Sequence, residues 1–349
     1  MSVTTIAQAF AQMLIDSQTQ KTALPFIRHQ LSVHPIVQHG EEFQSLTIGG
    51  SICQSDRMRI DGKAHSLDHK VLDQPSFNTE TEFLSYFKSV LDPHVRVVAL
   101  NFAYPLTPVS RNDVLDGILV SGSKENTFTG LVGKPVGETL ELYAKQKLHR
   151  TIKVSVANDT ICLLLSGLTQ FTWSELAAGI VGTGLNFALF LDEHTVVNLE
   201  SANFNAFEQT PEGKHIDQES VSPGDALFEK EVSGAYLYKH YNLIAQKKNL
   251  TPLANTKEID EKIRSGNVHE KETARTVLKR SAQLVACQIA GILEFQKRDL
   301  TFVMQGSLFW KGYEYREAVE KAVQEATQYK ATYVQIDNAD LLGAAKLVV

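Results

Sequence analysis

Asn158 and Asp159 stand where one apolar segment, residues 152–157, runs directly into another, residues 160–165. This pattern predicts a strand followed at once by a helix. A carboxylate just past a strand end could act as a general base toward an alcohol. Asp is also a favoured helix N-cap, and the local sequence alone favours Asp159 as the cap of a helix over residues 160–166.

Two glycine turns each follow an apolar segment: Gly-Gly-Ser at residues 49–51 and Gly-Thr-Gly at residues 182–184. Glycine lets the backbone approach a ligand closely, and successive N–H groups can bind a phosphate. An ordinary hairpin turn explains the same residues, and for either turn alone it is the better explanation. The presence of two such turns favours phosphate binding more than one would.

Several polar residues lie near predicted strand ends or helix starts: Lys124, Asn158, Asp159, Asn186, Glu200 and Glu229. Loop lysines and surface glutamates are usually solvated, and Glu229 would begin a helix, where a negative charge is favourable. Asn186 is more informative because it lies on an otherwise apolar strand, where a buried amide needs partners. Such a mixture of amides and carboxylates can bind several hydroxyls at once, which is what a polyol site needs.

The composition excludes other classes of protein. The 349 residues are 43% hydrophobic and 21% charged with a net charge of −6, which predicts a globular protein of about two domains without a basic surface for nucleic acid or acidic membrane. The longest apolar region, residues 176–191, is too short to span a bilayer, and the N-terminus does not resemble a signal peptide. Cys53, Cys162 and Cys287 are far apart, so we assign no metal ligands and expect a cytoplasmic protein.

Segments with strand and helix patterns alternate along the chain, which predicts an α/β fold. Strands are expected at 45–50, 56–62, 95–102, 152–158, 176–182, 186–192, 300–306 and 331–337, and helices at 225–246, 256–265, 271–297, 313–329 and 339–348. Residues 45–63 read as a hairpin with a polar loop after the glycine turn, and residues 176–200 as a second hairpin. The two hairpins suggest two related halves.

The order of these motifs resembles the hexokinase family of sugar kinases, in the actin-like ATPase superfamily. The resemblance covers about residues 43–349 and is carried by VANDT at 156–160, GTGLN at 182–186, NLE at 198–200 and FEKEVSGAYL at 228–237. The first and last of these make a chance match improbable. Nothing in the sequence indicates an oligomeric state.

The resemblance implies two actin-like (ribonuclease H-like) domains with a sugar and ATP cleft between them: a small domain, 43–158 plus 337–349, and a large domain, 1–42 plus 159–336. It implies an ATP- and Mg²⁺-dependent hexokinase or glucokinase that phosphorylates the 6-hydroxyl of a hexose, and glucose is the hexose that we expect. Asp159 would be the general base and Lys124 a second catalytic residue. The sugar would be bound by Ser123, Lys124, Asn158, Asp159, Asn186, Glu200 and Glu229. The nucleotide would be bound by Gly49, Gly50, Ser51, Gly182, Thr183, Gly184, Gly306 and Ser307.

The first glycine turn departs from the family pattern Asp-x-Gly-Gly-Thr-Asn-x-Arg. Thr47 replaces the Asp, Ser51 the Thr and Gln54 the Arg. A hydroxyl is a weaker Mg²⁺ ligand than a carboxylate because it brings no charge. Ala103 replaces a sugar-binding Ser, and Gln305 an Asp on the adenosine side. Two alternatives therefore stay open: a catalytically weak or inactive sugar-binding or regulatory protein, and a sugar kinase that uses another phosphoryl donor.

Overall fold

The computed structural model describes residues 1–49, 52–123 and 125–349 of the chain. The chain divides into two compact units, each made of three segments. Unit 1 comprises Met1–Phe26, Ala177–Phe187 and Leu199–Gln335, and unit 2 comprises Ile27–Leu176, Ala188–Asn198 and Ile336–Val349. The small and large domains expected from the sequence have other boundaries and stay a prediction.

Unit 2 is built around a five-stranded sheet with the strand order β4-β3-β2-β5-β8. Its strands are β1 (Ile27–Gln30), β2 (Glu42–Ile48), β3 (Ile52–Asp61), β4 (Lys63–Asp73), β5 (Val97–Phe102), β6 (Leu106–Arg111), β7 (Val114–Leu119), β8 (Lys153–Ala157) and β11 (Thr195–Asn198). Its helices are α2 (Glu80–Val90), α3 (Val136–Lys147), α4 (Asp159–Ser166) and α12 (Ala339–Ala345). β2, β3 and β4 pair antiparallel, whereas β5 and β8 continue the sheet in parallel with β2. β6 pairs with β7 and β1 with β11, both antiparallel.

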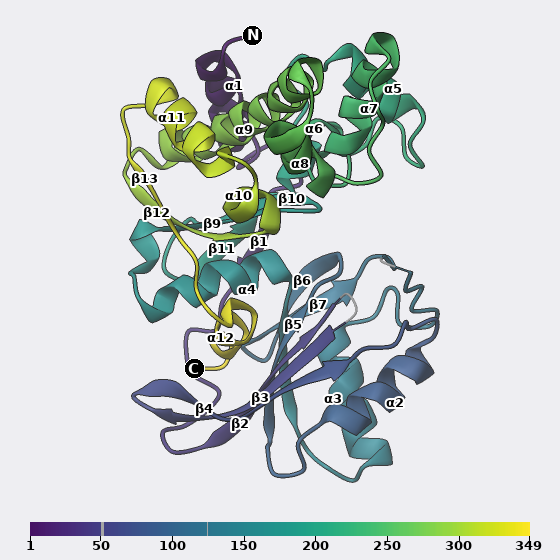
Figure 1. The fold of residues 1–349 in the computed structure, drawn as a ribbon. Coiled ribbons are helices and arrows are strands. Elements are labelled where there is room, and N and C mark those ends of the chain that lie inside the picture. Colours follow the sequence, from purple (N-terminus) through teal and green to yellow (C-terminus); the bar gives the residue numbers. More distant parts are fainter. Residues whose placement is uncertain (50–51, 124) are drawn as a thin grey trace. The chain divides into compact units, whose positions relative to one another are not determined.

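One face of this sheet carries the hydrophobic core of unit 2. Leu46, Leu100 and Val156 from three neighbouring strands are buried together with Phe83 of α2 and Leu140 of α3. α2 and α3 lie against this face of the sheet (Figure 1). Apolar residues at alternate positions of β2 and β5 point into this core, which is the pattern of a strand with a buried face.

The other face of the sheet packs against α12. Ser45, which points away from the core side, donates a hydrogen bond of 2.7 Å from its Oγ to the carbonyl of Leu341 in α12. α12 in turn packs closely on α4 at Gly343, where a Cβ atom would lie 1.7 Å from the carbonyl oxygen of Cys162. Only glycine fits this crossing, so α12 holds α4, with Asp159 at its first turn, against the sheet.

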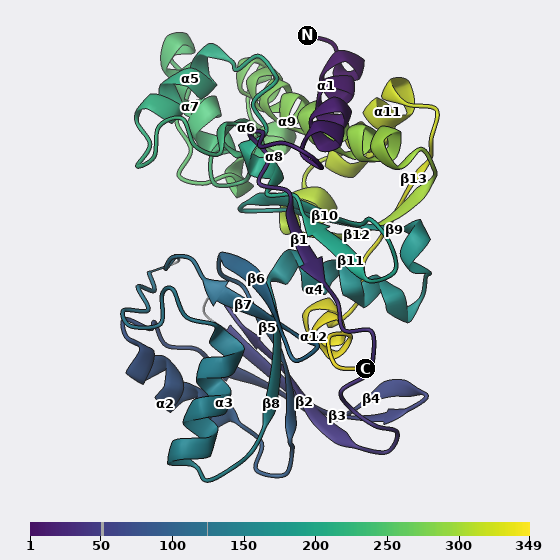
Figure 2. The same ribbon diagram turned by 180° about the vertical axis from the view of Figure 1, so that it is seen from behind.

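Unit 1 contains most of the helices, which Figure 2 shows from behind. They are α1 (Val3–Asp16), α5 (Pro211–Gln218), α6 (Leu227–Val232), α7 (Leu237–Lys248), α8 (Lys257–Ser265), α9 (Val268–Gln296), α10 (Ser307–Lys311) and α11 (Tyr315–Ala326), with the short 3₁₀ helix η3 (Ser201–Asn203). Its strands are β12 (Leu300–Gln305) and β13 (Ala331–Val334), which pair in parallel, together with most of β9 (Leu176–Val181) and the first residues of β10 (Leu185–Phe190). α9 is the central element, because α1, α6, α7, α8 and α11 all pack against it.

The predicted α/β class and all eight predicted strands are found in the structure. Two predictions about the extent of a strand and of a helix were wrong. Residues 52–55 belong to β3 and do not form a polar loop, because they pair with residues of both β2 and β4. The helix expected over residues 225–246 is broken between α6 and α7, because backbone groups in the break bond to another part of unit 1.

The strands β4, β6 and β7 and the helices α2 and α3 were not predicted. β4 is exposed along most of its length, so it lacks the apolar alternation of a half-buried strand. Among the residues that the structure describes, none belongs to a helix both long and apolar enough to cross a membrane.

Candidate active site

α4 begins at Asp159, and its N-cap is Asn158, whose Oδ1 accepts a hydrogen bond of 3.0 Å from the N–H of Ile161. The prediction that Asp159 caps this helix was therefore wrong. Asp159 lies inside the first turn, where its Oδ1 accepts hydrogen bonds from the backbone N–H of Thr160 at 2.8 Å and from its hydroxyl at 3.3 Å. Within the described chain, the other oxygen, Oδ2, has no hydrogen-bond partner. Asp159 thus keeps one oxygen with which it could accept a proton.

The parallel strands of unit 2 bring their carboxyl ends together beside this helix start. Thr47 of β2 lies opposite Asn101 of β5, and Asn101 lies opposite Ala157, the last residue of β8. Among the residues that the structure describes, the buried Thr47 hydroxyl and both buried amide atoms of Asn101 have no hydrogen-bond partner. Open α/β sheets bind ligands at this edge, and a buried polar atom without a partner is costly, so the edge is suited to a polar ligand or ordered water.

Gly49, which follows β2, is explained by packing. A Cβ atom on Gly49 would lie 2.3 Å from the Cβ of Ala103, and the Gly49 N–H donates a hydrogen bond of 3.0 Å to Oε1 of Gln74. Its N–H is therefore engaged with the protein, which leaves the predicted phosphate contact of Gly49 without structural support. Gly50 and Ser51, predicted to bind nucleotide, lie outside the described residues.

The predicted sugar-contact loop after β7 is held by a residue that sequence reasoning missed. Asn126 is 4% exposed, and its Oδ1 accepts a hydrogen bond of 2.6 Å from the N–H of Phe77. Its backbone N–H and its side-chain Nδ2 both donate to the carbonyl of Ser123, at 2.9 and 3.3 Å. Asn126 therefore fixes the backbone at Ser123. Lys124, the predicted catalytic lysine, lies outside the described residues.

Asp116 anchors the strand from which this loop departs. The side chain is fully buried, and its carboxylate accepts hydrogen bonds from Nε of Arg111 at 2.6 Å and from the N–H groups of Gly117, Gly137 and Glu138 at 2.7–3.0 Å. α3 has no side-chain cap of its own at Pro135, so Asp116 satisfies its first N–H groups from β7. One carboxylate thereby joins β6, β7 and α3.

In unit 1, the segment after α6 holds the Gly-Thr-Gly turn between β9 and β10 through two backbone hydrogen bonds. The N–H of Gly234 donates to the carbonyl of Gly182 at 2.7 Å, and the N–H of Ala235 to that of Thr183 at 3.2 Å. Gly234 cannot carry a side chain, because its Cβ would lie 2.9 Å from the carbonyl oxygen of Gly182. The Gly-Ala of FEKEVSGAYL thus supports the predicted phosphate turn, a role that the sequence did not reveal.

The second predicted nucleotide segment lies directly against this turn. Gly306 has a φ of +113°, and a Cβ there would lie 2.2 Å from the carbonyl oxygen of Val181. A Cβ on Gly182 would lie 3.2 Å from the Cα of Gly306. Two glycines therefore let the end of β9 meet the start of α10, so the structure brings Gly182 and Thr183 together with Gly306 and Ser307.

A cavity of about 630 Å³ opens at this junction, entirely within unit 1. It is lined by Gly182, Thr183, Gly234, Asn255, Thr256, Lys257, Asp260, Leu278, Ser307, Leu308, Lys311 and Gly312. Two lysines offer positive charge for phosphates, and two leucines offer apolar surface for a base. Asp260, whose pKa is raised by burial, accepts a hydrogen bond of 3.0 Å from the N–H of Tyr313. The residues at 255–257 and Lys311 were missed because they belong to no recognisable motif.

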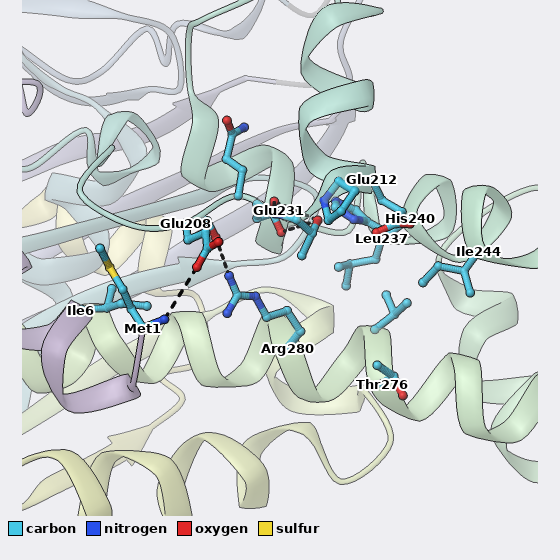
Figure 3. A pocket seen from close by; sticks show the side chains of 14 residues that line it. Met1, Ile6, Glu208, Glu212, Glu231, Leu237, His240, Ile244, Thr276 and Arg280 are labelled. Atoms are coloured by element: carbon cyan, nitrogen blue, oxygen red, sulfur yellow. Dashed lines mark hydrogen bonds and ion pairs between the residues drawn. The ribbon is translucent and has the colours of Figure 1, made fainter.

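Glu229 faces the start of β10. Its Oε2 accepts a hydrogen bond of 2.9 Å from the N–H of Leu185 and lies 3.0 Å from where a Cβ of Gly184 would be. The two charged residues that follow it make contacts elsewhere. Lys230 donates a hydrogen bond of 2.5 Å to Asp217. Glu231 lines a second cavity (Figure 3) and accepts a hydrogen bond of 2.6 Å from the N–H of Thr210. Of these charged residues in α6, Glu229 alone contacts the glycine turn.

Asn186 and the turn at Glu200 complete the group in unit 1. Oδ1 of Asn186 accepts hydrogen bonds from the N–H of Phe187 at 2.8 Å and from that of Ser201 at 3.3 Å. Glu200 has a φ of +48°, an uncommon conformation for a residue with a side chain. The structure therefore places Asn186, Glu200 and Glu229, all predicted sugar ligands, around one end of β10. The described residues contain no group of three His, Cys, Asp or Glu able to hold a metal ion.

Replacement of Glu229 by Gln is expected to stabilise the fold in a pH-dependent way. Burial raises the pKa of Glu229, and the hydrogen bond from Leu185 only partly offsets this. The ionised side chain therefore costs stability at neutral pH, whereas below the ordinary Glu pKa, about 4.3, both states are protonated and the cost vanishes. The gain in Glu229→Gln should grow as pH rises from that value through the raised pKa.

Urea unfolding of both proteins across the acid to neutral range measures this gain. Glu193→Gln, at an exposed position, is the control and should leave the unfolding free energy little changed at every pH. A Glu229→Gln protein less stable than the unmodified one at neutral pH would show that its carboxylate is compensated in a way that the hydrogen bond from Leu185 does not reveal.

Comparison with known proteins identifies similar sequences in one family. The family model described as hexokinase matches residues 176–249 and 246–349. Hexokinase-2, chloroplastic, of Nicotiana tabacum is 31% identical over 159 residues, which are 41% of this chain and 31% of that protein. Hexokinase-1 of Spinacia oleracea is 26% identical over 239 residues, 57% of this chain and 46% of that protein. The chain thus spans less than half the length of these curated relatives.

Solved structures match over nearly the whole chain. The hexokinase from Schistosoma mansoni complexed with glucose has a TM-score of 0.77 at 20% identity and covers 100% of this chain and 95% of that one. The ROK hexokinase from Thermus thermophilus has a TM-score of 0.62 at 17% identity, covering 88% and 97%. These likenesses confirm the predicted α/β fold and show that the chain shares the fold of the two matched structures.

Proposed function

Because this chain belongs to the hexokinase family, we propose that it transfers the γ-phosphate of ATP to the 6-hydroxyl of a hexose. The observation that carries the proposal is the arrangement at the glycine turn of unit 1. There Glu229 accepts from Leu185 while Gly234 donates to Gly182, so a predicted sugar ligand and a predicted phosphate turn are held by one segment. The glucose named with the Schistosoma mansoni structure favours glucose as the acceptor.

In this proposal Asp159 takes the proton of the 6-hydroxyl as that oxygen attacks the γ-phosphate. Its place in the first turn of α4 and its second oxygen, Oδ2, support this role. Asn158, Asn186, Glu200, Glu229 and Ser123 would bind the other hydroxyls. Lys124 is included on the resemblance alone. Phosphoryl transfer asks the protein mainly for positioning, which suits residues held by backbone hydrogen bonds.

The nucleotide would occupy the cavity of about 630 Å³, with its phosphates at Gly182, Thr183 and Gly184 and its adenosine beside Gly306 and Ser307. The volume lies within the range typical of small-molecule sites. ATP would bring Mg²⁺ with it. The described residues fit such an ion poorly as a dedicated protein site, since they offer no group of three ligands. Mg²⁺ commonly keeps its waters and binds through substrate phosphates, and in this proposal the phosphates of ATP would hold it.

A catalytically weak sugar-binding protein is the second candidate, because Thr47 stands where the family carries Asp and the N–H of Gly49 is bound to Gln74. Both features weaken the first glycine turn as a phosphate site. For the location of the protein we propose the cytoplasm, which the three buried free thiols of Cys53, Cys162 and Cys287 support, since such thiols suit a reducing compartment.

ADP release from the purified protein tests the proposal. With MgATP we expect release that depends on hexose and is greatest with glucose among glucose, fructose and mannose. Inorganic polyphosphate and GTP serve as alternative donors in parallel reactions, in which formation of hexose phosphate is measured because these donors release no ADP. Hexose-dependent turnover with another donor only would overturn ATP as the donor. Glucose binding by calorimetry without turnover on any donor would leave the sugar-binding protein.

A further inference from the structure

Gln288 lies in the middle of the most buried stretch of α9. Residues 284–293, LVACQIAGIL, are all buried, and the exposure of Gln288 is 0%. An amide removed from water into an apolar environment costs free energy unless its hydrogen bonds are replaced. Gln288 is therefore an expensive residue at this position, and the contacts that it makes should explain its presence.

The amide of Gln288 holds the turn that carries Glu200. Its Nε2 donates a hydrogen bond of 2.8 Å to the carbonyl of Ser201. The N–H of the same residue, Ser201, donates to Oδ1 of Asn186. Ser201 is thus held from two sides, by Asn186 from β10 and by Gln288 from α9. Glu200, in its left-handed conformation, immediately precedes it.

Stability alone does not account for this amide. The other amide atom, Oε1, is buried and has no hydrogen-bond partner in the described part of the chain. The carbonyl of Ser201 also accepts a hydrogen bond of 3.1 Å from the N–H of Phe204, so it would stay bonded if Gln288 were apolar. An apolar residue of similar size at position 288 would therefore leave no unsatisfied acceptor at Ser201 and would remove the unsatisfied Oε1. What an apolar residue could not do is fix the turn at Ser201.

A second polar residue of α9 acts in the same way. Ser281 lies seven residues before Gln288, which is about two helical turns and so places both on one face. It is fully buried and donates a hydrogen bond of 2.7 Å to the carbonyl of Val232, two residues before Gly234. α9 therefore contacts both segments of the site in unit 1 through single side chains on an otherwise apolar face.

We infer that Gln288 is a positioning residue for the hexose, because it fixes the turn from which Glu200 would reach the sugar. The inference rests on the proposed function. It assigns Gln288 no contact with the substrate, and it predicts a loss confined to sugar binding. The nucleotide cavity contains none of Asn186, Glu200 or Gln288 among its lining residues, so nucleotide binding should be spared.

Gln288→Met removes the donor and keeps the size of the side chain. We expect hexose to bind about tenfold more weakly by calorimetry, as for the loss of one well-placed hydrogen bond. The KM for hexose should rise while kcat changes little. ADP should bind with unchanged affinity, and the melting temperature should be unchanged or higher. Gln283→Met is the matched control, since it makes the same change in the same helix at a residue that lines another cavity.

Equal hexose affinity in Gln288→Met and the unmodified protein would overturn the inference and leave the proposed function intact. A parallel loss of hexose and ADP binding would do the same, because it would mark Gln288 as a general structural residue. Gln288→Leu is the second variant. If neither variant folds, the inference is also overturned, because Gln288 would then be a general structural residue. Absence of hexose binding by the unmodified protein would overturn the proposed function itself.

Discussion

Replacement of Asp159 by Asn is expected to slow hexose phosphorylation by about 10²–10⁴-fold while hexose still binds. The amide can hydrogen-bond the 6-hydroxyl, but it cannot accept a proton at neutral pH. Stability should change little, because the amide oxygen can replace the Oδ1 that accepts hydrogen bonds from Thr160. ADP release at saturating MgATP and hexose measures the rate, and calorimetry with hexose alone measures binding.

Asp113→Asn is the matched control for this variant. Asp113 is exposed in the turn between β6 and β7, where its φ of +63° is a conformation that Asn tolerates well. The control should keep the full rate. A rate in Asp159→Asn within about threefold of the unmodified protein would contradict the base assignment, since even a modest general base contributes about a hundredfold.

Replacement of Asp116 by Ala is expected to lower the free energy of unfolding by about 3–5 kcal/mol, as for a buried ion pair that loses one partner. Arg111 would lose the oxygen that accepts from its Nε, and the N–H groups of Gly117, Gly137 and Glu138 would lose their acceptor. Urea unfolding measures the change. Asp116 links β6, β7 and α3, so Asp116→Ala should destabilise all three elements.

Asp116→Asn separates charge from hydrogen bonding, because it keeps one acceptor oxygen, and its loss should be smaller than that of Asp116→Ala. Asp61→Ala, at the exposed end of β3, should change stability by no more than about 0.5 kcal/mol. A loss below about 1 kcal/mol in Asp116→Ala would mean that water replaces the carboxylate at the start of α3.

The sequence by itself determined the α/β class, the strand-to-helix junction at 152–166 and the two glycine turns, because each depends on local patterns of apolar, polar and glycine residues. The ordered motifs that resemble hexokinases also identified the family. Local patterns did not decide which of two adjacent polar residues caps α4. Asn158 and Asp159 are both good caps, and only the backbone conformation at the junction selects Asn158.

Only the tertiary structure decided how the site is held together. The break between α6 and α7 exists because Gly234 bonds to Gly182, a residue some fifty positions earlier in the chain. A side chain at Gly49 would clash with Ala103, so only glycine fits there. The buried amide of Gln288 is explained by the hydrogen bond that it donates to Ser201. Such contacts join residues far apart in the sequence, and the periodicity of one segment carries no information about its distant partner. The sequence therefore determined which residues could do the chemistry, and long-range hydrogen bonds and close packing decided which of them are held in place for it.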